Sequence, residues 1–318
     1  MLPTIDQGPH DHRERPIREP ILVFGAPRSG TSMLFQALST HPDLWSLYRE
    51  SQEVIEKLMA PALERHDSEE LTAEDLGPET AAQLARRFFD HVGNAEAASA
   101  VRSRLPLILR ARLNRLLTAG GSGAKPASIR IVEKNPQNSF RLRFLEGVFP
   151  DAWFIYIVRN PAPTIASIYR GWSEPRFRLY PVPPDFTISG FRGTNWAFGR
   201  PPGWRDMNGR SLMEVCAFQW RSYNERAMQD TARLGDRVMR IRYEDLSERP
   251  GEVLNSIAEW AHLDPRSLAR FADRLPVVNT WSRPSAEKWR SLAPQIEEIM
   301  PSVAETANAL GYEVVPSR

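Results

Sequence analysis

The segment Gly25 to Ser32 (GAPRSGTS) has the G-x-x-x-x-G-[KT]-[ST] spacing of a phosphate-binding loop. In such a loop, backbone N–H groups at the start of a helix face a phosphate, with the helix dipole behind them. Thr31 stands where nucleoside triphosphatases carry the lysine that reaches the β- and γ-phosphates. A nucleotide without a γ-phosphate has less need of that lysine, and the cation of this loop is Arg28. The pattern therefore predicts an anion site with an arginine beside the reacting group.

A second anion-binding pattern starts at Arg159, directly after the apolar run 153–158 (WFIYIV). A guanidinium group at this point can form two parallel hydrogen bonds with a phosphate. Ser167, eight residues later and inside the expected helix, can add a hydroxyl donor. Arg159 and Ser167 are therefore candidates for holding a second phosphate.

Four apolar runs predict the strands that position these residues. The run 21–24 (ILVF) is closed by Gly25 and Pro27, which is typical of a strand buried on both faces. Because strands alternate with helices along the chain, we predict an α/β fold: a three-layer sandwich around a mainly parallel sheet, with a P-loop-like nucleotide site and helical insertions. The expected strands are 21–24, 129–132, 153–158 and 238–243.

The remaining segments have distinct patterns. Apolar spacing predicts a helical insert over about 50–118, followed by the surface connection 118–128 (TAGGSGAKPAS). Ser211 and Glu214 form a capping box for a helix that runs to about Ala232. A last helix is expected through Leu292 to Leu310, with Gly311 as its C-terminal stop. We expect 1–20 to be a polar, flexible tail and 21–318 to be a single domain.

The stretch 172–209 has no periodicity and holds three tryptophans, five arginines, six prolines and five glycines. An irregular connection of this length inside a domain is usually functional or disordered, and the aromatic residues favour function. Two interpretations stay open. The stretch is either a mobile cover over an acceptor site, with its tryptophans stacking on the acceptor, or a segment that those tryptophans pack down. The tryptophans are Trp172, Trp196 and Trp204, and the arginines that could meet an anionic or glycan acceptor are Arg176, Arg178, Arg192, Arg200 and Arg205.

Composition excludes several classes. With 318 residues, 42 % hydrophobic content and nine tryptophans, the chain is not disordered. Its 41 basic and 39 acidic residues give a net charge of +2, which argues against general nucleic-acid binding. Cys216 is the single cysteine, and no run approaches the ~20 apolar residues of a membrane span. Because the first 20 residues also lack the apolar core of a secretory signal, we expect a cytoplasmic protein.

The two phosphate motifs, in this order and context, resemble those of the sulfotransferases that use 3′-phosphoadenosine 5′-phosphosulfate (PAPS). GAPRSGTS matches the family's 5′-phosphosulfate loop, and Arg159 to Ser167 (RNPAPTIAS) matches its 3′-phosphate motif, R-x-P-x₅-S. The chain is most similar to the bacterial and tyrosylprotein-like enzymes with PRSGT in the first loop. Three weaker similarities extend the resemblance over nearly the whole chain: Glu133 to Pro136 (EKNP), Arg242 to Leu246 (RYEDL) and Lys288 to Arg290 (KWR).

The resemblance implies a role for particular residues. Arg28 matches the loop cation of the family and Lys134 a lysine before a proline-bearing turn, and both would stabilise charge on the leaving phosphate. Glu50 is our candidate for the base that activates the acceptor hydroxyl, while Glu53 and His41 remain alternatives. An arginine cannot readily give up its proton, so Arg28 is expected to act by charge and not as an acid.

The same resemblance implies the rest of the nucleotide site and the reactants. The donor would be PAPS and the product 3′-phosphoadenosine 5′-phosphate (PAP), with no metal, and the acceptor a hydroxyl of a small molecule, glycan or lipid. Alternatives are another P-loop-type transferase or kinase and a catalytically inactive nucleotide-binding protein, and a homodimer is possible. The predicted nucleotide-binding residues are Arg28, Ser29, Gly30, Thr31, Ser32, Arg159, Ser167, Tyr243, Ser285, Lys288 and Arg290.

Overall fold

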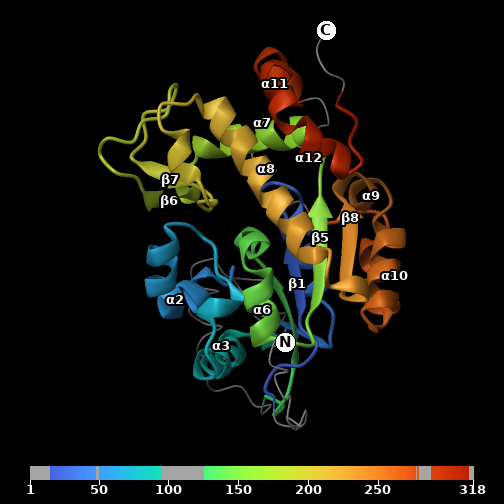
Figure 1. Ribbon diagram of the computed structural model, residues 1–318. Helices are drawn as coiled ribbons and strands as arrows, with labels where there is room; N and C mark the ends of the chain where they lie inside the picture. The colour runs from blue at the N-terminus through green and yellow to red at the C-terminus, as the bar shows by residue number, and fades with distance from the viewer. Residues whose placement is uncertain (1–14, 48–49, 95–124, 277, 279–287, 315–318) are drawn as a thin grey trace, which may run out of the picture.

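A six-stranded sheet forms the centre of the molecule in the computed structural model, which describes residues 15–47, 50–94, 125–276, 278 and 288–314 (Figure 1). Its strand order is β3-β2-β4-β1-β5-β8, and every neighbouring pair is parallel except β2 with β3. The prediction of a mainly parallel sheet is confirmed. The strands are β1 (Ile21–Phe24), β2 (Leu44–Ser46), β3 (Gly93–Asn94), β4 (Arg130–Lys134), β5 (Trp153–Val158) and β8 (Val238–Arg242).

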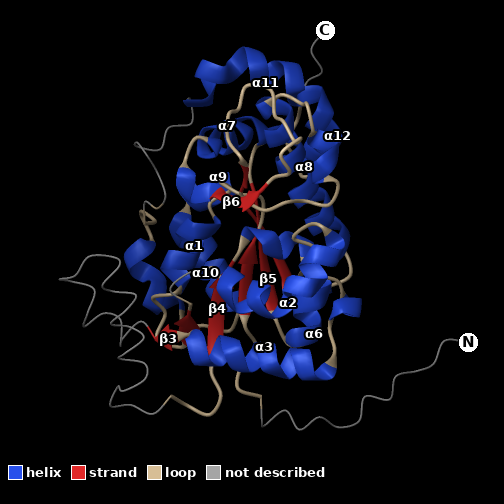
Figure 2. Cartoon of the chain, turned by 90° about the vertical axis from the view of Figure 1, so that its left-hand side faces the viewer, coloured by secondary structure: helices blue, strands red, loops and turns tan. Residues whose placement is uncertain are grey.

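Alternate residues of the strands enter two separate cores, so helices cover both faces of the sheet (Figure 2). Phe24, Phe154 and Tyr156 pack into the larger core with α3, α6, α7 and α8, whereas Ile155 and Ile157 face α1, α9 and α10. This is the expected three-layer sandwich. The bounds are α1 (Thr31–Leu38), α3 (Pro78–His91), α6 (Leu142–Val148), α7 (Pro161–Trp172), α8 (Leu212–Thr231), α9 (Tyr243–Glu248) and α10 (Pro250–Trp260).

The start of α8 follows its sequence signal, whereas the C-terminal helix is interrupted. Ser211 and Glu214 form the predicted reciprocal capping box at the start of α8. At the other end of the chain, the expected single helix is broken into α11 (Ala293–Ile299), a 3₁₀ turn at Met300–Val303 and α12 (Ala304–Ala309). Pro301 cannot donate a backbone hydrogen bond, which accounts for the break. Gly311 follows α12 with a φ of 81°, as its role of C-terminal stop requires.

Ordered structure begins before Ile21, contrary to the expectation of a tail over residues 1–20. Ile17 is buried and forms a bridge with Ile129, so residues 15–20 pack along the sheet. The insert is helical over α2 (Gln52–His66) and α3, but it also contributes β3, which pairs antiparallel with β2. Residues 95–118 of the insert and most of the predicted 118–128 connection lie outside the described residues. No helix in the described ranges is both long and apolar enough to cross a bilayer.

The stretch 172–209 contains regular structure that its sequence did not reveal. Strands β6 (Arg178–Pro181) and β7 (Asn195–Ala197) form an antiparallel pair apart from the central sheet (Figure 1). Trp172, Trp196 and Trp204 are each at most 2 % exposed, with ring centroids of neighbouring pairs 5.2 and 5.4 Å apart. The tryptophans therefore form the core of this segment and are not free to stack on an acceptor.

Candidate functional site

The carboxyl ends of four adjacent parallel strands bring the predicted residues to one edge of the sheet. The phosphate loop follows β1, Lys134 ends β4, Arg159 follows β5 and Tyr243 follows β8. In open α/β sheets this edge is where ligands bind. A cleft opens there, and its lining includes six of the predicted nucleotide-binding residues: Arg28, Gly30, Thr31, Ser32, Arg159 and Tyr243.

Two glycines shape the loop between β1 and α1. Gly25 has a φ of 146°, and a Cβ atom there would lie 2.3 Å from the carbonyl oxygen of Ile157. Gly30 is the N-cap residue of α1 and has a φ of 98°, and a Cβ atom there would lie 2.5 Å from the ring of Tyr243. Any side chain at either position would push the loop off the sheet or off Tyr243, which explains the glycines at both positions.

The two phosphate motifs contact each other. The Nε of Arg28 donates a hydrogen bond to Ser167 Oγ at 3.1 Å, and Nη1 of Arg159 donates to the carbonyl oxygen of Arg28 at 2.8 Å. The Arg159 guanidinium also lies over the ring of Tyr243, 3.9 Å from its centroid. Since Tyr243 packs in turn on Gly30, this tyrosine joins both motifs into one unit.

Positive charge is concentrated in the cleft. Burial and the nearby guanidinium groups of Arg159 and Arg176 lower the pKa of Arg28 to about 10. Burial also lowers the pKa of Arg159. Arg28 nevertheless stays charged at neutral pH, and a bound anion would offset the repulsion between these cations.

Among the described residues, the buried atoms without a hydrogen-bond partner include two donors of the two phosphate motifs, Ser29 Oγ and Arg159 Nε. Unsatisfied buried groups are rare, because each one costs about 1–3 kcal/mol. A phosphate or sulfate oxygen is an acceptor of the kind that both can serve. The loop, its cations and these unused donors fit an anionic nucleotide.

Lys134 and Glu50 form an ion pair in the wall of the cleft, where Lys134 is 7 % and Glu50 37 % exposed. The two predicted alternatives to Glu50 lie elsewhere. Both ring nitrogens of His41, which is fully buried, are engaged by the backbone of Asp43 and Asp264. Glu53 is exposed on α2 and does not line the cleft. The structure thus brings Glu50, and neither alternative, next to Lys134.

Glu133 is a buried acid beside this pair that the sequence analysis did not single out. Its Oε2 accepts a hydrogen bond from Asn138 at 2.7 Å, and its side chain is 1 % exposed. Burial raises the pKa of Glu133 to about 7, with the charge of Glu50 adding to the rise and that of Lys134 opposing it. Glu133 lies in β4 directly after Ile131 and Val132, and this place in a strand is the one signal that could have revealed its burial.

The other end of the cleft is apolar and comes largely from the stretch 172–209. Phe177, Leu179 and Phe198 line it, together with Gly199 and, from α8, Tyr223. None of these five was a sequence-based candidate, because no local motif marks them. They meet only after β6 has paired with β7.

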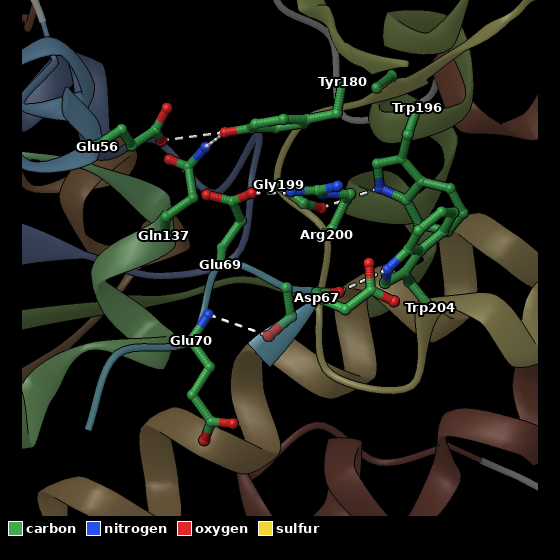
Figure 3. A network of polar contacts seen from close by, with 12 residues as sticks. Glu56, Asp67, Glu69, Glu70, Gln137, Tyr180, Trp196, Gly199, Arg200 and Trp204 are labelled. Carbon is green, nitrogen blue, oxygen red and sulfur yellow. Dashed lines mark hydrogen bonds and ion pairs between the residues drawn. The ribbon is translucent and has the colours of Figure 1, made fainter. Parts of the chain in front are cut away.

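A network of polar contacts fastens this end to the insert (Figure 3). Glu69 is buried between Arg141, at 2.7 Å, and Arg200, at 3.5 Å. The Tyr180 hydroxyl donates to Glu56 at 3.1 Å, and Gln137 donates to that hydroxyl at 3.4 Å. Gln137 itself lines the cleft, so the network holds part of the cleft wall.

Three further predicted residues remain predictions. Ser285 lies outside the described residues. Lys288 and Arg290 belong to the short 3₁₀ helix Lys288–Leu292, and Arg290 is exposed and does not line the cleft. Within the described ranges, no group of three His, Cys, Asp or Glu side chains could hold a metal ion.

Comparisons with solved structures agree with this architecture. Sulfotransferase STF9 from Mycobacterium avium matches with 18 % identity and a TM-score of 0.50, over 96 % of this chain and 80 % of that one, which shows a shared fold. The sulfotransferase domain from the curacin biosynthetic pathway matches with 19 % identity and a TM-score of 0.46, over 94 % and 99 % of the two chains. Mouse sulfotransferase SULT7A1 in complex with PAP matches with 13 % identity and a TM-score of 0.43, over 91 % and 84 %.

Sequence comparison identifies the family. No curated protein matches this chain significantly. The model of the sulfotransferase family, however, matches residues 20–182, which is more than half of the 318 residues and includes both phosphate motifs. The chain therefore belongs to the sulfotransferase family and is an enzyme of sulfuryl transfer.

Proposed function

We propose that this enzyme transfers the sulfuryl group of PAPS to the hydroxyl of an acceptor molecule, and that Arg28, Glu50 and Lys134 carry the reaction. One observation carries the proposal: the 5′-phosphosulfate loop and the 3′-phosphate motif are joined through Arg28, Arg159 and Tyr243 in one cationic cleft. Ser29 Oγ and Arg159 Nε supply donors that no group of the described chain uses.

In this proposal each motif binds one end of the donor substrate. Backbone N–H groups of the loop, with the hydroxyl groups of Ser29, Thr31 and Ser32, would hold the 5′-phosphosulfate. Arg159 and Ser167 would hold the 3′-phosphate, which is a dianion at neutral pH. PAPS supplies an activated sulfuryl group on a phosphate that leaves as part of PAP.

The protein's contribution is positioning and charge stabilisation, as in phosphoryl transfer. A bond forms between the acceptor oxygen and sulfur while the bond between sulfur and the bridging phosphate oxygen breaks. Arg28 and Lys134 would stabilise the negative charge that develops on that phosphate. Glu50 would take the proton of the acceptor hydroxyl. Its ion pair with Lys134 holds the base and one of the cations together in the cleft wall.

The rival functions differ at specific residues. A kinase or triphosphatase would use a lysine at the position of Thr31. An inactive nucleotide-binding protein would have lost Arg28, Glu50 or Lys134, whereas all three are present and line the cleft. We also propose a reducing, cytoplasmic environment, in keeping with the buried, unbridged thiol of Cys216.

Calorimetric titration with PAP and AMP tests the nucleotide assignment. PAP should bind more tightly than AMP, and Arg159→Ala should weaken PAP binding by about 1.5–3 kcal/mol, the range for a hydrogen bond to a charged group. The same change should weaken AMP binding less, because AMP has no 3′-phosphate and loses only the support that Arg159 gives to the loop through the Arg28 carbonyl. Arg240→Ala, which removes an exposed arginine of β8 outside the cleft, is the matched control. Equal affinity of the wild-type protein for PAP and AMP would refute the assignment.

A further inference from the structure

The two ends of the cleft have different chemistry. Arg28, Arg159 and Lys134 line the donor end, whereas Phe177, Leu179 and Phe198 line the opposite end. The two ends are continuous: the Arg28 guanidinium lies 5.6 Å from the ring centroid of Phe177. An acceptor whose hydroxyl reaches the cations must therefore place the rest of its body against these apolar side chains.

Phe198 is held firmly in this wall. Its φ is 63°, a left-handed conformation that bulky residues rarely adopt and that is often found at ligand-contacting positions. Its ring stacks on Phe177 with 4.9 Å between centroids and an interplanar angle of 24°. It also packs against Gly171 of α7, where a Cβ atom would come within 2.5 Å of the ring. The surrounding contacts thus maintain a strained backbone in order to present this ring.

Leu179 offers apolar surface to solvent at the same end. It is 44 % exposed and is the exposed large hydrophobic residue among those the structure describes. A single exposed leucine is common on protein surfaces, but this one lines the cleft next to the Phe177–Phe198 pair. The three side chains together form an apolar wall, defined here as Phe177, Leu179 and Phe198.

Part of the polar equipment that the sequence offered to a sugar is engaged by the protein itself (Figure 3 shows Arg200, Trp196 and Trp204). Arg200 pairs with Glu69, and Arg205 pairs with Asp67. The indole N–H groups of Trp196 and Trp204 donate to the carbonyl oxygens of Gly199 and Asp67. These two arginines and two tryptophans therefore hold the segment in place, which reduces the number of partners left for a polyhydroxylated acceptor.

We propose that the acceptor is a hydroxyl compound with an apolar body, aromatic or aliphatic, that packs on the apolar wall, and that it is not a glycan. This inference rests on the proposed sulfuryl transfer to a hydroxyl. Of the three acceptor classes, it excludes the glycan and keeps small molecules and lipids whose surface matches the wall, since contact of apolar surfaces removes both from water.

Four probes test the acceptor class in assays with labelled PAPS: 2-naphthol, 1-octanol, methyl α-glucoside and trehalose. We expect transfer to one or both apolar alcohols and none above background to the sugars. The two apolar probes distinguish an aromatic from an aliphatic body. Calorimetry provides a readout besides turnover: the preferred apolar probe should bind the enzyme–PAP complex, and the sugars should not.

Two substitutions in the apolar wall and a matched control test whether these side chains bind the apolar probe. Leu179→Ser removes an exposed apolar side chain and should fold. Phe198→Asn keeps a residue that tolerates a positive φ but removes a buried ring, so its melting temperature is measured alongside, and Leu179→Ser carries the test if the Phe198 variant unfolds. Each should weaken binding of the apolar probe to the enzyme–PAP complex on the order of ten- to a hundredfold, as the loss of one large buried apolar side chain predicts. Val182→Ser, in the same segment but outside the cleft, should change it less than twofold.

Three results would overturn the inference: preferential transfer to a sugar, equal effects of Leu179→Ser and Val182→Ser, or absence of transfer to any of the four probes with intact PAP binding. PAP affinity separates these failures from failure of the proposed function. If PAP binds tightly and selectively, only the acceptor class is wrong, whereas loss of PAP selectivity over AMP refutes the proposed function itself.

Discussion

The donor and acceptor ends of the cleft are built in different ways. The donor end consists of residues that directly follow or end four adjacent parallel strands, β4, β1, β5 and β8. The apolar end, to which we assign the acceptor and which we call the acceptor end, comes largely from the stretch 172–209, which has its own two-stranded sheet and its own aromatic core. The central sheet therefore fixes the donor end, whereas packing outside the sheet fixes the acceptor end.

Because the two ends are built differently, substitutions at each end should affect different properties of the enzyme. Substitutions at the donor end should alter nucleotide binding or the chemical step whatever the acceptor is. Substitutions at the acceptor end should alter which molecule is used and leave nucleotide affinity intact. The Glu69–Arg200 pair and the Tyr180–Gln137 contact fasten the stretch 172–209 to the insert and to the segment after β4, so the apolar wall is held in place relative to Lys134.

The largest effect on turnover is expected at Glu50. Glu50→Gln keeps the shape of the side chain but removes its basicity, so kcat should fall by about 10²–10⁴. PAP affinity should hardly change, because the substitution affects the acceptor's proton. Glu53→Gln, three residues further along the same segment and exposed, is the matched control and should be silent. Turnover within threefold of wild type for Glu50→Gln would assign the base to another residue.

Loss of the loop cation should have the next largest effect. Arg28 has a φ of 70°, so Arg28→Asn is a better test than alanine because asparagine tolerates this conformation. We expect kcat to fall by on the order of 10²–10³, the cost of removing one group that stabilises charge in the transition state. A fall in PAP affinity with unchanged kcat would instead make Arg28 a binding residue only.

Glu133, beside the donor end of the cleft, makes the stability of the folded protein depend on pH. Its pKa is about 7 in the folded protein against an ordinary value of 4.5, so the unfolded chain loses this proton first as the pH rises. The folded state then binds more protons than the unfolded state, and this group makes the protein less stable between about pH 4.5 and 7, with no further change above. The total loss is about 3 kcal/mol.

Glu133→Gln mimics the protonated acid and removes this loss. Relative to wild type, the free energy of unfolding of the variant in urea should therefore rise by up to about 3 kcal/mol between about pH 4 and pH 8. A difference from wild type that does not vary with pH for Glu133→Gln would mean that the buried acid keeps its ordinary pKa.

The sequence was sufficient to predict that residues of the two phosphate motifs meet at the donor end, because the signals for them are local. A strand, a glycine loop and a helix are consecutive in the chain, and parallel strands must bring their carboxyl ends, with Lys134, Arg159 and Tyr243, to one edge. Strand β2 was missed because three residues show no periodicity. The positive φ of Phe198 was unpredictable, since it is imposed by contacts with Phe177 and Gly171 and not by a residue type that favours it.

The last prediction concerns whether the stretch 172–209 is a mobile cover or a packed segment. Arg192 is exposed between β6 and β7, while Arg205 adjoins buried Trp204 and pairs with Asp67. Cleavage by trypsin requires local opening, and the aromatic core raises the free energy of opening around Arg205. In the free enzyme we therefore expect early cleavage after Arg192 and at least tenfold slower cleavage after Arg205, as measured by mass spectrometry of timed digests.

The variant Trp204→Leu and the addition of PAP complete the test by trypsin digestion. Trp204→Leu removes the indole donor to Asp67 and two ring contacts, so it should accelerate cleavage after Arg205 and leave cleavage after Arg192 unchanged. Adding PAP should not change the order of the two cuts, because neither Arg192 nor Arg205 lines the cleft in which we propose that the nucleotide binds. Equally fast cuts in the free enzyme, both suppressed when PAP and an acceptor are bound, would instead identify a mobile cover that closes over the substrates and keeps water, a competing acceptor, from the sulfuryl group.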